Sequence, residues 1–167
     1  MTALAGGNYE SWQSGQSFEL ALDLRVDVLQ PASDSTETRA DDRALVLLFE
    51  TGGQTLLWAG RIGVKTQRDL ITRYPGLHAD VLVMAADTRP DDAWLESLRV
   101  RHWLQLPPRE SWLNATGSAS VLGGSCKIWP LNETGAVDVH FQPVRDRQPA
   151  AILLRPWLAL PAEPTSQ

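Results

Sequence analysis

The sequence is short of cysteine and of long hydrophobic segments, and each shortage excludes a class of protein. Cys126 has no second cysteine in the chain with which to form a disulfide, so nothing indicates an oxidising compartment. No segment reaches the ~20 apolar residues that a membrane-spanning helix requires. The first residues lack the basic start and apolar centre of a signal peptide. The sequence as given is therefore expected to be soluble.

Basic residues are also few. The 167 residues include 15 Lys and Arg against 20 Asp and Glu, and the basic residues form no run. Because binding to nucleic acid depends on clustered Lys and Arg side chains that contact phosphates, we expect no strong direct nucleic-acid binding. The seven tryptophans then favour core packing or a protein interface over a base-stacking surface. The length and the 43% hydrophobic content indicate one globular domain.

The usual sequence motifs of catalytic sites are missing as well. The three histidines, His78, His102 and His140, form no His-x-His or His-x3-His pair. Metal sites commonly take two ligands from one local segment. There is neither a Gly-x-Ser-x-Gly nucleophile motif nor a glycine-rich phosphate loop that ends in Gly-Lys-Ser/Thr. The motifs alone therefore predict no catalytic residue and no cofactor.

What the sequence does contain is a regular series of hydrophobic segments. Apolar residues recur at every second position from Phe18 to Val28, which predicts one long or two short strands. Two apolar runs, 44–49 and 55–59, flank Gly52-Gly53. Glycine tolerates the positive φ of a tight turn, so the two runs predict a hairpin. Because both runs are nearly continuous in apolar residues, we expect both faces of these strands to be covered.

Strands and helices then alternate, which predicts an α/β layer structure. An amphipathic helix is predicted to begin at Val64 and to end before Pro75-Gly76. A second helix begins at Asp91 or Asp92, either of which can cap it, and its apolar residues are expected to point inward: Trp94, Leu95 and Leu98. The remaining predicted elements are strands near 79–85, 101–107, 135–141 and 150–160, and one helical turn at 109–115.

Six short segments follow one another in an order that is typical of a known family: VDVLQP, RALVLLFETGG, LLWAGRIGVKTQRDL, ADVLVMAADTR, LRVRHWLQLP and GAVDVHF. Together they resemble the C-terminal half of the metallo-β-lactamase-like domain of the ComEC DNA-uptake proteins. The resemblance implies an α/β fold that is half of an αββα sandwich, with a mixed sheet, hairpin strands and flanking helices. We expect this single domain at 17–155. Residues 1–16 are rich in Gly, Ser, Asn and Gln, which predicts a flexible leader, and 156–167 are expected to form a disordered tail. In the family, the domain is attached to the bacterial inner membrane.

The positions at which the family binds metal ions differ in this sequence. Arg61 stands where the family has the Asp of a Thr-Gly-Asp turn, and a guanidinium cannot lose its proton to become a ligand. The family's His-His pair falls on Ala86, which has no ligand atom, and on Asp87. The family's upstream His-x-His-x-Asp-His motif has no counterpart. The resemblance therefore implies a non-catalytic relative without a cofactor, in which we expect Arg61 and Asp87 to form an ion pair where the metal would lie.

Half of a sandwich exposes an apolar sheet face, and such a face predicts a partner. The expected partner is the missing N-terminal half of the domain, a membrane channel domain or a second copy of the chain. The chain would then act in DNA uptake as a structural or interaction module. One alternative is a metal-dependent hydrolase or nuclease, with an atypical site at Asp87, His102 and His140 or with a site that another chain completes. Another alternative is an unrelated α/β binding module.

Overall fold

The computed structural model describes residues 11–31, 44–88, 90–107, 126–142 and 151–157, which adopt an α/β fold. Seven strands form one sheet in chain order: β1 (Ser17–Ala21), β2 (Leu24–Gln30), β3 (Val46–Thr51), β4 (Gln54–Gly60), β5 (Val81–Ala85), β6 (His102–Leu106) and β7 (Lys127–Pro130). Three helices are described: α1 (Val64–Arg73), α2 (Asp92–Leu98) and α3 (Leu131–Thr134). A separate antiparallel pair is formed by two strands: β8 (Val137–Gln142) and β9 (Ala151–Pro156).

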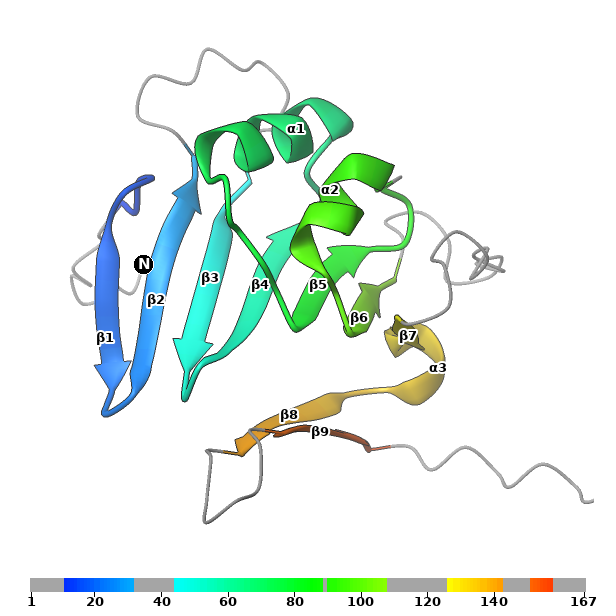
Figure 1. Cartoon of the computed structure of the whole chain (residues 1–167). Coiled ribbons are helices and arrows are strands. Elements are labelled where there is room, and N and C mark those ends of the chain that lie inside the picture. The colour runs from blue at the N-terminus through cyan, green and yellow to red at the C-terminus, as the bar shows by residue number, and fades with distance from the viewer. Residues whose placement is uncertain (1–10, 32–43, 89, 108–125, 143–150, 158–167) are drawn as a thin grey trace, which may run out of the picture.

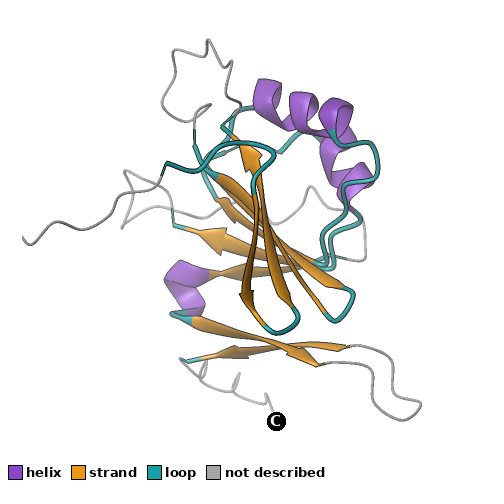
Figure 2. Cartoon of the chain, turned by 90° about the vertical axis from the view of Figure 1, so that its left-hand side faces the viewer, coloured by secondary structure: helices purple, strands orange, loops and turns teal. Residues whose placement is uncertain are grey.

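The seven-stranded sheet is mixed. Strands β1 to β4 are antiparallel to their neighbours, whereas β4 to β7 are parallel. Parallel neighbours need a crossover connection, which α1 provides between β4 and β5 and α2 between β5 and β6. Both helices cover the same face of the sheet (Figure 1), and the β8–β9 pair lies on the other side (Figure 2). The predicted α/β fold, with a mixed sheet, hairpin strands and flanking helices, is confirmed.

The turn between β3 and β4 follows directly from its two glycines. Thr51 pairs with Gln54, which leaves Gly52 and Gly53 as a two-residue loop. Their φ angles are 56° and 75°, and the turn type that best matches the twist of a hairpin requires positive φ at both positions. The hairpin that the sequence predicts is therefore confirmed.

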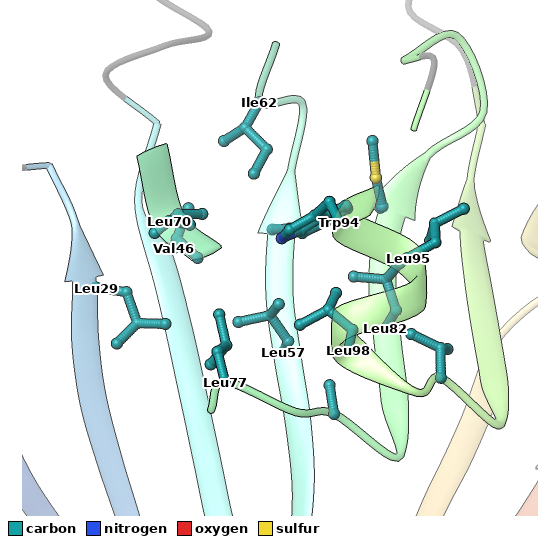
Figure 3. Packing of buried hydrophobic residues seen from close by; sticks show 14 of the residues in the cluster. Leu29, Val46, Leu57, Ile62, Leu70, Leu77, Leu82, Trp94, Leu95 and Leu98 are labelled. Atoms are coloured by element: carbon teal, nitrogen blue, oxygen red, sulfur yellow. The ribbon is translucent and has the colours of Figure 1, made fainter. Parts of the chain in front are cut away.

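The main core lies between the helices and the sheet (Figure 3). Trp94, Leu95 and Leu98 of α2 are buried in it, as their helical spacing predicts. They pack with strand residues of the same face, of which Leu57 and Leu82 are completely buried. Burial of apolar surface stabilises a fold by ~25 cal/mol per Å², so this layer contributes most to holding the helices on the sheet.

The described residues cover the opposite face of the sheet only in part. The β8–β9 pair packs over β5 and β6, where it forms a second cluster around Val83 and Leu104. At the other end of the sheet, Trp12 and Phe18 pack on β2 and β3 in a third cluster. Between these two clusters, Trp58 of β4 is 43% exposed. The prediction that both faces of β3 and β4 are covered is therefore wrong at Trp58, because the two-stranded layer does not reach across it.

Part of the predicted leader (1–16) is attached to the sheet. The backbone N–H of Ser14 donates to the carbonyl oxygen of Pro31 at 2.8 Å. Residues 11–16 therefore belong with the folded domain. The rest of the leader and most of the predicted tail (156–167) lie outside the described residues.

Two short elements, β7 and α3, were not predicted. Each has four residues, which is too short for an apolar period to show in the sequence. Pro130 ends β7 and is also the N-cap residue of α3. The predicted helical turn at 109–115 lies outside the described residues.

One buried side chain points to a stabilising substitution. The side chain of Gln54 is buried, and among the described residues neither its amide nitrogen nor its amide oxygen has a hydrogen-bond partner. A buried polar group without a partner costs about 1–3 kcal/mol, and an apolar group of the same shape removes that cost. We therefore expect Gln54→Met to raise the free energy of unfolding by about 1 kcal/mol, measured as a higher urea midpoint at an unchanged slope.

Gln67 provides the matched control for this prediction. It is also completely buried, but its amide donates to the carbonyl of Ile62 at 3.1 Å and accepts from the N–H of Asp91 at 2.7 Å. Gln67→Met leaves these two backbone groups without their partner and should lower stability by about 1–3 kcal/mol. Equal losses in both variants would contradict the description of Gln54.

Candidate functional site at the carboxyl edge of the parallel strands

The candidate site lies where the parallel strands β4, β5 and β6 end. These strands share one direction, so their carboxyl ends meet at a single edge of the sheet. In open α/β sheets this edge is the usual place for a ligand. Arg61 follows β4, Asp87 follows β5 by two residues, and Pro107 follows β6. Three segments far apart in the sequence therefore bring their side chains and carbonyl groups to one place.

An ion pair occupies this edge. The Nη1 of Arg61 donates to both carboxylate oxygens of Asp87. The Nη2 of Arg61 donates to the carbonyl oxygen of Pro107 at 2.8 Å. The side chain of Arg61 is 22% exposed and that of Asp87 is 38% exposed, so the pair lies at the surface but is partly shielded. The ion pair that the sequence predicts is confirmed, and the carbonyl of Pro107 is an additional acceptor that was not predicted.

The turn after β4 places Arg61 at this edge. Gly60 has a φ of 58°, in the left-handed region where glycine is favoured, and the pairing of β4 with β5 shifts register between Trp58 and Gly60. Ile62, the next residue after Arg61, is completely buried in the main core. The left-handed conformation of Gly60 on one side and the buried side chain of Ile62 on the other fix the direction of the Arg61 side chain.

A polar network behind the ion pair joins the turn to both helices. Gln67 of α1 bonds to Ile62 in the turn and to the N–H of Asp91. Asp91 is the N-cap of α2, where its carboxylate accepts from the N–H of Trp94 at 3.3 Å. Arg68 donates to the same carboxylate at 2.8 Å. Of the two predicted caps, the structure selects Asp91. Gln67 was missed, because a glutamine in a helix normally indicates an exposed position.

The charge of Asp91 makes stability depend on pH in acid. The hydrogen bond from Arg68 lowers the pKa of Asp91 below its ordinary value of 3.8, and the N–H of Trp94 lowers it further. A depressed pKa in the folded state stabilises the fold above the ordinary pKa and loses this contribution as pH falls through the folded value. We expect Asp91→Asn, which still caps the helix, to weaken the fall in urea midpoint below pH ~4.

Arg68→Gln removes the main cause of this pKa shift and tests the same prediction from the other side. The variant should show the same weakened dependence on pH as Asp91→Asn, and the double variant should add little to either change. A full dependence on pH in Arg68→Gln would contradict the assignment of the shift to this ion pair.

The structure does not bring the alternative metal ligands together. His102 pairs with Val81 at the amino end of the parallel strands, whereas Asp87 lies beyond their carboxyl end. The four steps of β5 from Val81 to Ala85, at ~3.3 Å per residue, already separate the two ends by roughly 13 Å. His140 lies on the exposed side of β8, in the other sheet. Within the described ranges, no three His, Cys, Asp or Glu side chains gather as they would around a metal ion.

The contacts of three further residues are those of structural positions: His102, Ala86 and Cys126. The Nε1–H of Trp129 donates to the Nδ1 of His102 at 3.5 Å, and burial, followed by the charges of Lys127 and Arg101, lowers the pKa of His102. The backbone N–H of Ala86 donates to the carbonyl of Leu106 at 2.9 Å. Burial raises the pKa of the Cys126 thiol, which keeps it protonated and unreactive.

The chain matches no protein-family model and no curated protein. Within the described residues, no helix combines the length and the apolar character that crossing a membrane requires.

Proposed function

We propose that this chain is a non-catalytic domain related to the metallo-β-lactamase-like domain of the ComEC proteins. Its role would be structural or interactive, in DNA uptake, and not hydrolytic. The observation that carries this proposal is the ion pair of Arg61 and Asp87 at the carboxyl edge of β4, β5 and β6. Arg61 and Asp87 are the residues at which the resemblance would otherwise place metal ligands.

The chemistry of the pair explains why hydrolysis is not expected. Metal-assisted hydrolysis needs carboxylate and imidazole ligands that hold the ions and lower the pKa of a bound water. Arg61 supplies a permanent positive charge instead, which repels a divalent cation, and it has no lone pair to donate. Both oxygens of Asp87 accept hydrogen bonds from this same guanidinium. The charges of Arg61 and Asp87 therefore neutralise each other within the site.

The order of elements also supports the relationship. The hairpin β3–β4, the helix α1, the strand β5, the helix α2 and the strand β6 follow one another as in the segments on which the resemblance rests. Within the described residues, the helices cover one face of the sheet, whereas the β8–β9 pair and the cluster at Trp12 and Phe18 cover the other face in part. This is the arrangement expected for half of a two-sheet sandwich, and a partner would complete the open face. The candidates are the N-terminal half of the domain, a membrane channel domain or a second copy.

Two assays test the proposal. Purified chain should not cleave linear or plasmid DNA in the presence of Mn²⁺ or Zn²⁺. Deletion of its coding region should lower natural transformation in the organism that encodes it. A plasmid copy with Asp87→Asn should restore transformation, because Asp87 has no catalytic role. Metal-dependent cleavage that Asp87→Asn abolishes would overturn the non-catalytic assignment, and an unchanged transformation frequency after deletion would overturn the role in DNA uptake.

A further inference from the structure

An apolar groove lies on the open face of the sheet. It has a volume of about 580 Å³ and runs between the β3–β4 hairpin and β8. The residues that line it include Phe49, Leu56 and Trp58 from the sheet and Val139, His140 and Phe141 from β8. No residue of β9 lines the groove, so β8 is the strand that borders it. The groove therefore combines an open sheet face with one edge of a strand.

That edge of β8 carries backbone groups that β9 does not use. The N–H of Trp157 donates to the carbonyl of Ala136, and β8 continues in the same antiparallel register. Along such a ladder, residue pairs that exchange hydrogen bonds alternate with pairs that do not. The backbone N–H and C=O groups of Val137, Val139 and Phe141 therefore point away from β9. Among the described residues, β8 pairs with β9 alone. The groove is thus bordered by a row of peptide donors and acceptors.

The groove is continuous with the packing that already joins the two sheets. Leu56 and Val139 also belong to the cluster beneath the β8–β9 pair. Phe49 belongs to the cluster at the other end of the sheet. An apolar side chain in the groove would therefore connect two existing clusters. Of the residues that line it, none carries an Asp, Glu, Lys or Arg charge, so the groove fits uncharged side chains.

We propose that an extended segment of a partner protein adds, as a third strand, to the edge of β8 that faces away from β9 and packs its apolar side chains on Trp58 and Phe49. The inference rests on the proposed function, since it names how the partner engages the open face. Main-chain hydrogen bonds supply affinity in this mode of recognition, and alternate side chains supply specificity. The partner segment is therefore a strand of about six residues that is apolar at every second position, to match the length of β8.

A second copy of the chain does not fit the same place. The apolar side chains of β8, Val137 and Val139, pack on the sheet of their own chain. Two copies joined edge to edge at β8 would each keep their own β2 and β3 beneath the groove. These strands would then need the same space. The occupant is therefore a strand that brings no such sheet with it.

A designed peptide tests the proposal. The probe is the capped peptide Thr-Val-Thr-Val-Thr-Val-Thr with a short lysine tail, and the matched control peptide has proline at the central position. We expect the probe to shift the NMR signals of the Val139 and Phe141 amides and of the Trp58 indole, with a Kd below ~1 mM. The control peptide should bind at least about tenfold more weakly, because proline removes a donor from the new ladder.

A protein variant separates strand addition from non-specific apolar contact. Val139→Pro removes a backbone N–H that points away from β9, so the β8–β9 ladder keeps its hydrogen bonds. This variant should lose probe binding, and Trp58→Ala should weaken it. The amide spectra of the two unbound variants should stay dispersed, which shows that they are folded. Equal binding by Val139→Pro, or shifts confined to other surfaces, would overturn the proposal.

Hydrogen exchange of the free chain provides a further test. The Val139 and Phe141 amides should exchange quickly in the isolated chain and slowly with the probe bound. Slow exchange in an isolated monomer would show that another segment of the chain already fills the groove. Slow exchange in a self-associated state, measured by analytical ultracentrifugation, would show a second copy there. Either result would overturn the proposal, while the DNA-cleavage and transformation results would stand independently.

Discussion

Trp94→Ala is expected to lower the free energy of unfolding by about 3–5 kcal/mol, the largest loss for any single substitution considered for this chain. Trp94 is completely buried at the centre of the main core, where α2 meets the sheet (Figure 3). Truncation to alanine removes the contacts of the indole ring and leaves a cavity that the surrounding side chains fill only in part. Since typical domains are stable by only 5–15 kcal/mol, much of the margin would be lost.

Trp157→Ala is the matched control, because Trp157 is 71% exposed. It removes the same side chain from the surface and should change stability by less than about 0.5 kcal/mol. Urea unfolding followed by far-UV circular dichroism measures both variants, since neither depends on the fluorescence of the residue removed. Similar losses in the two variants would contradict the packing of α2 on this face of the sheet.

Arg61→Asp is expected to have the second large effect, on the binding of divalent cations. The substitution places a second carboxylate beside Asp87 and frees the carbonyl of Pro107, which gives three hard oxygen groups at one edge. Such oxygens are the ligands that Mg²⁺, Ca²⁺ and Mn²⁺ prefer. Without metal, the two acids repel each other and the variant should be less stable by about 1 kcal/mol, since both positions are partly exposed.

Added Mn²⁺ should reverse this loss in the variant. A cation at ten times its Kd stabilises the folded state by ~1.4 kcal/mol, which appears as a rise in Tm of a few degrees. Wild-type protein should show no such rise. Arg61→Gln removes the positive charge without adding a ligand and serves as the control, which should also show no rise. A Mn²⁺-dependent rise in Tm in wild type and Arg61→Gln alike would show that Arg61 does not exclude the metal.

Much of the fold is predictable because local rules and tertiary packing agree. The glycine pair fixes the β3–β4 turn, and the spacing of Trp94, Leu95 and Leu98 fixes the inward face of α2. The ion pair is predictable for a related reason. The resemblance implies that the positions of Arg61 and Asp87 converge, and the parallel strands of the structure bring both residues to a common edge.

Other features depend on contacts that no local pattern specifies. The carbonyl of Pro107 accepts from Arg61 because β6 ends beside β5, which the sequence alone does not state. Gln67 is polar by type but buried by its two backbone partners. The continuous apolar run predicts that Trp58 is covered. Trp58 is partly exposed, because such a run does not reveal how wide the neighbouring layer is. The face of β4 at Trp58 is open because, in the described part of the chain, the β8–β9 layer has only two strands and does not reach across it.

The central claim is that Arg61 and Asp87 satisfy each other at the edge where the proposed relationship would place a metal site. Calorimetric titration of purified wild-type protein with Mn²⁺ and with Zn²⁺ tests it most directly. The ion pair predicts no saturable binding at this edge, so Asp87→Asn should leave the titration unchanged. One equivalent of either cation bound with micromolar Kd by wild type, and lost in Asp87→Asn, would contradict the claim.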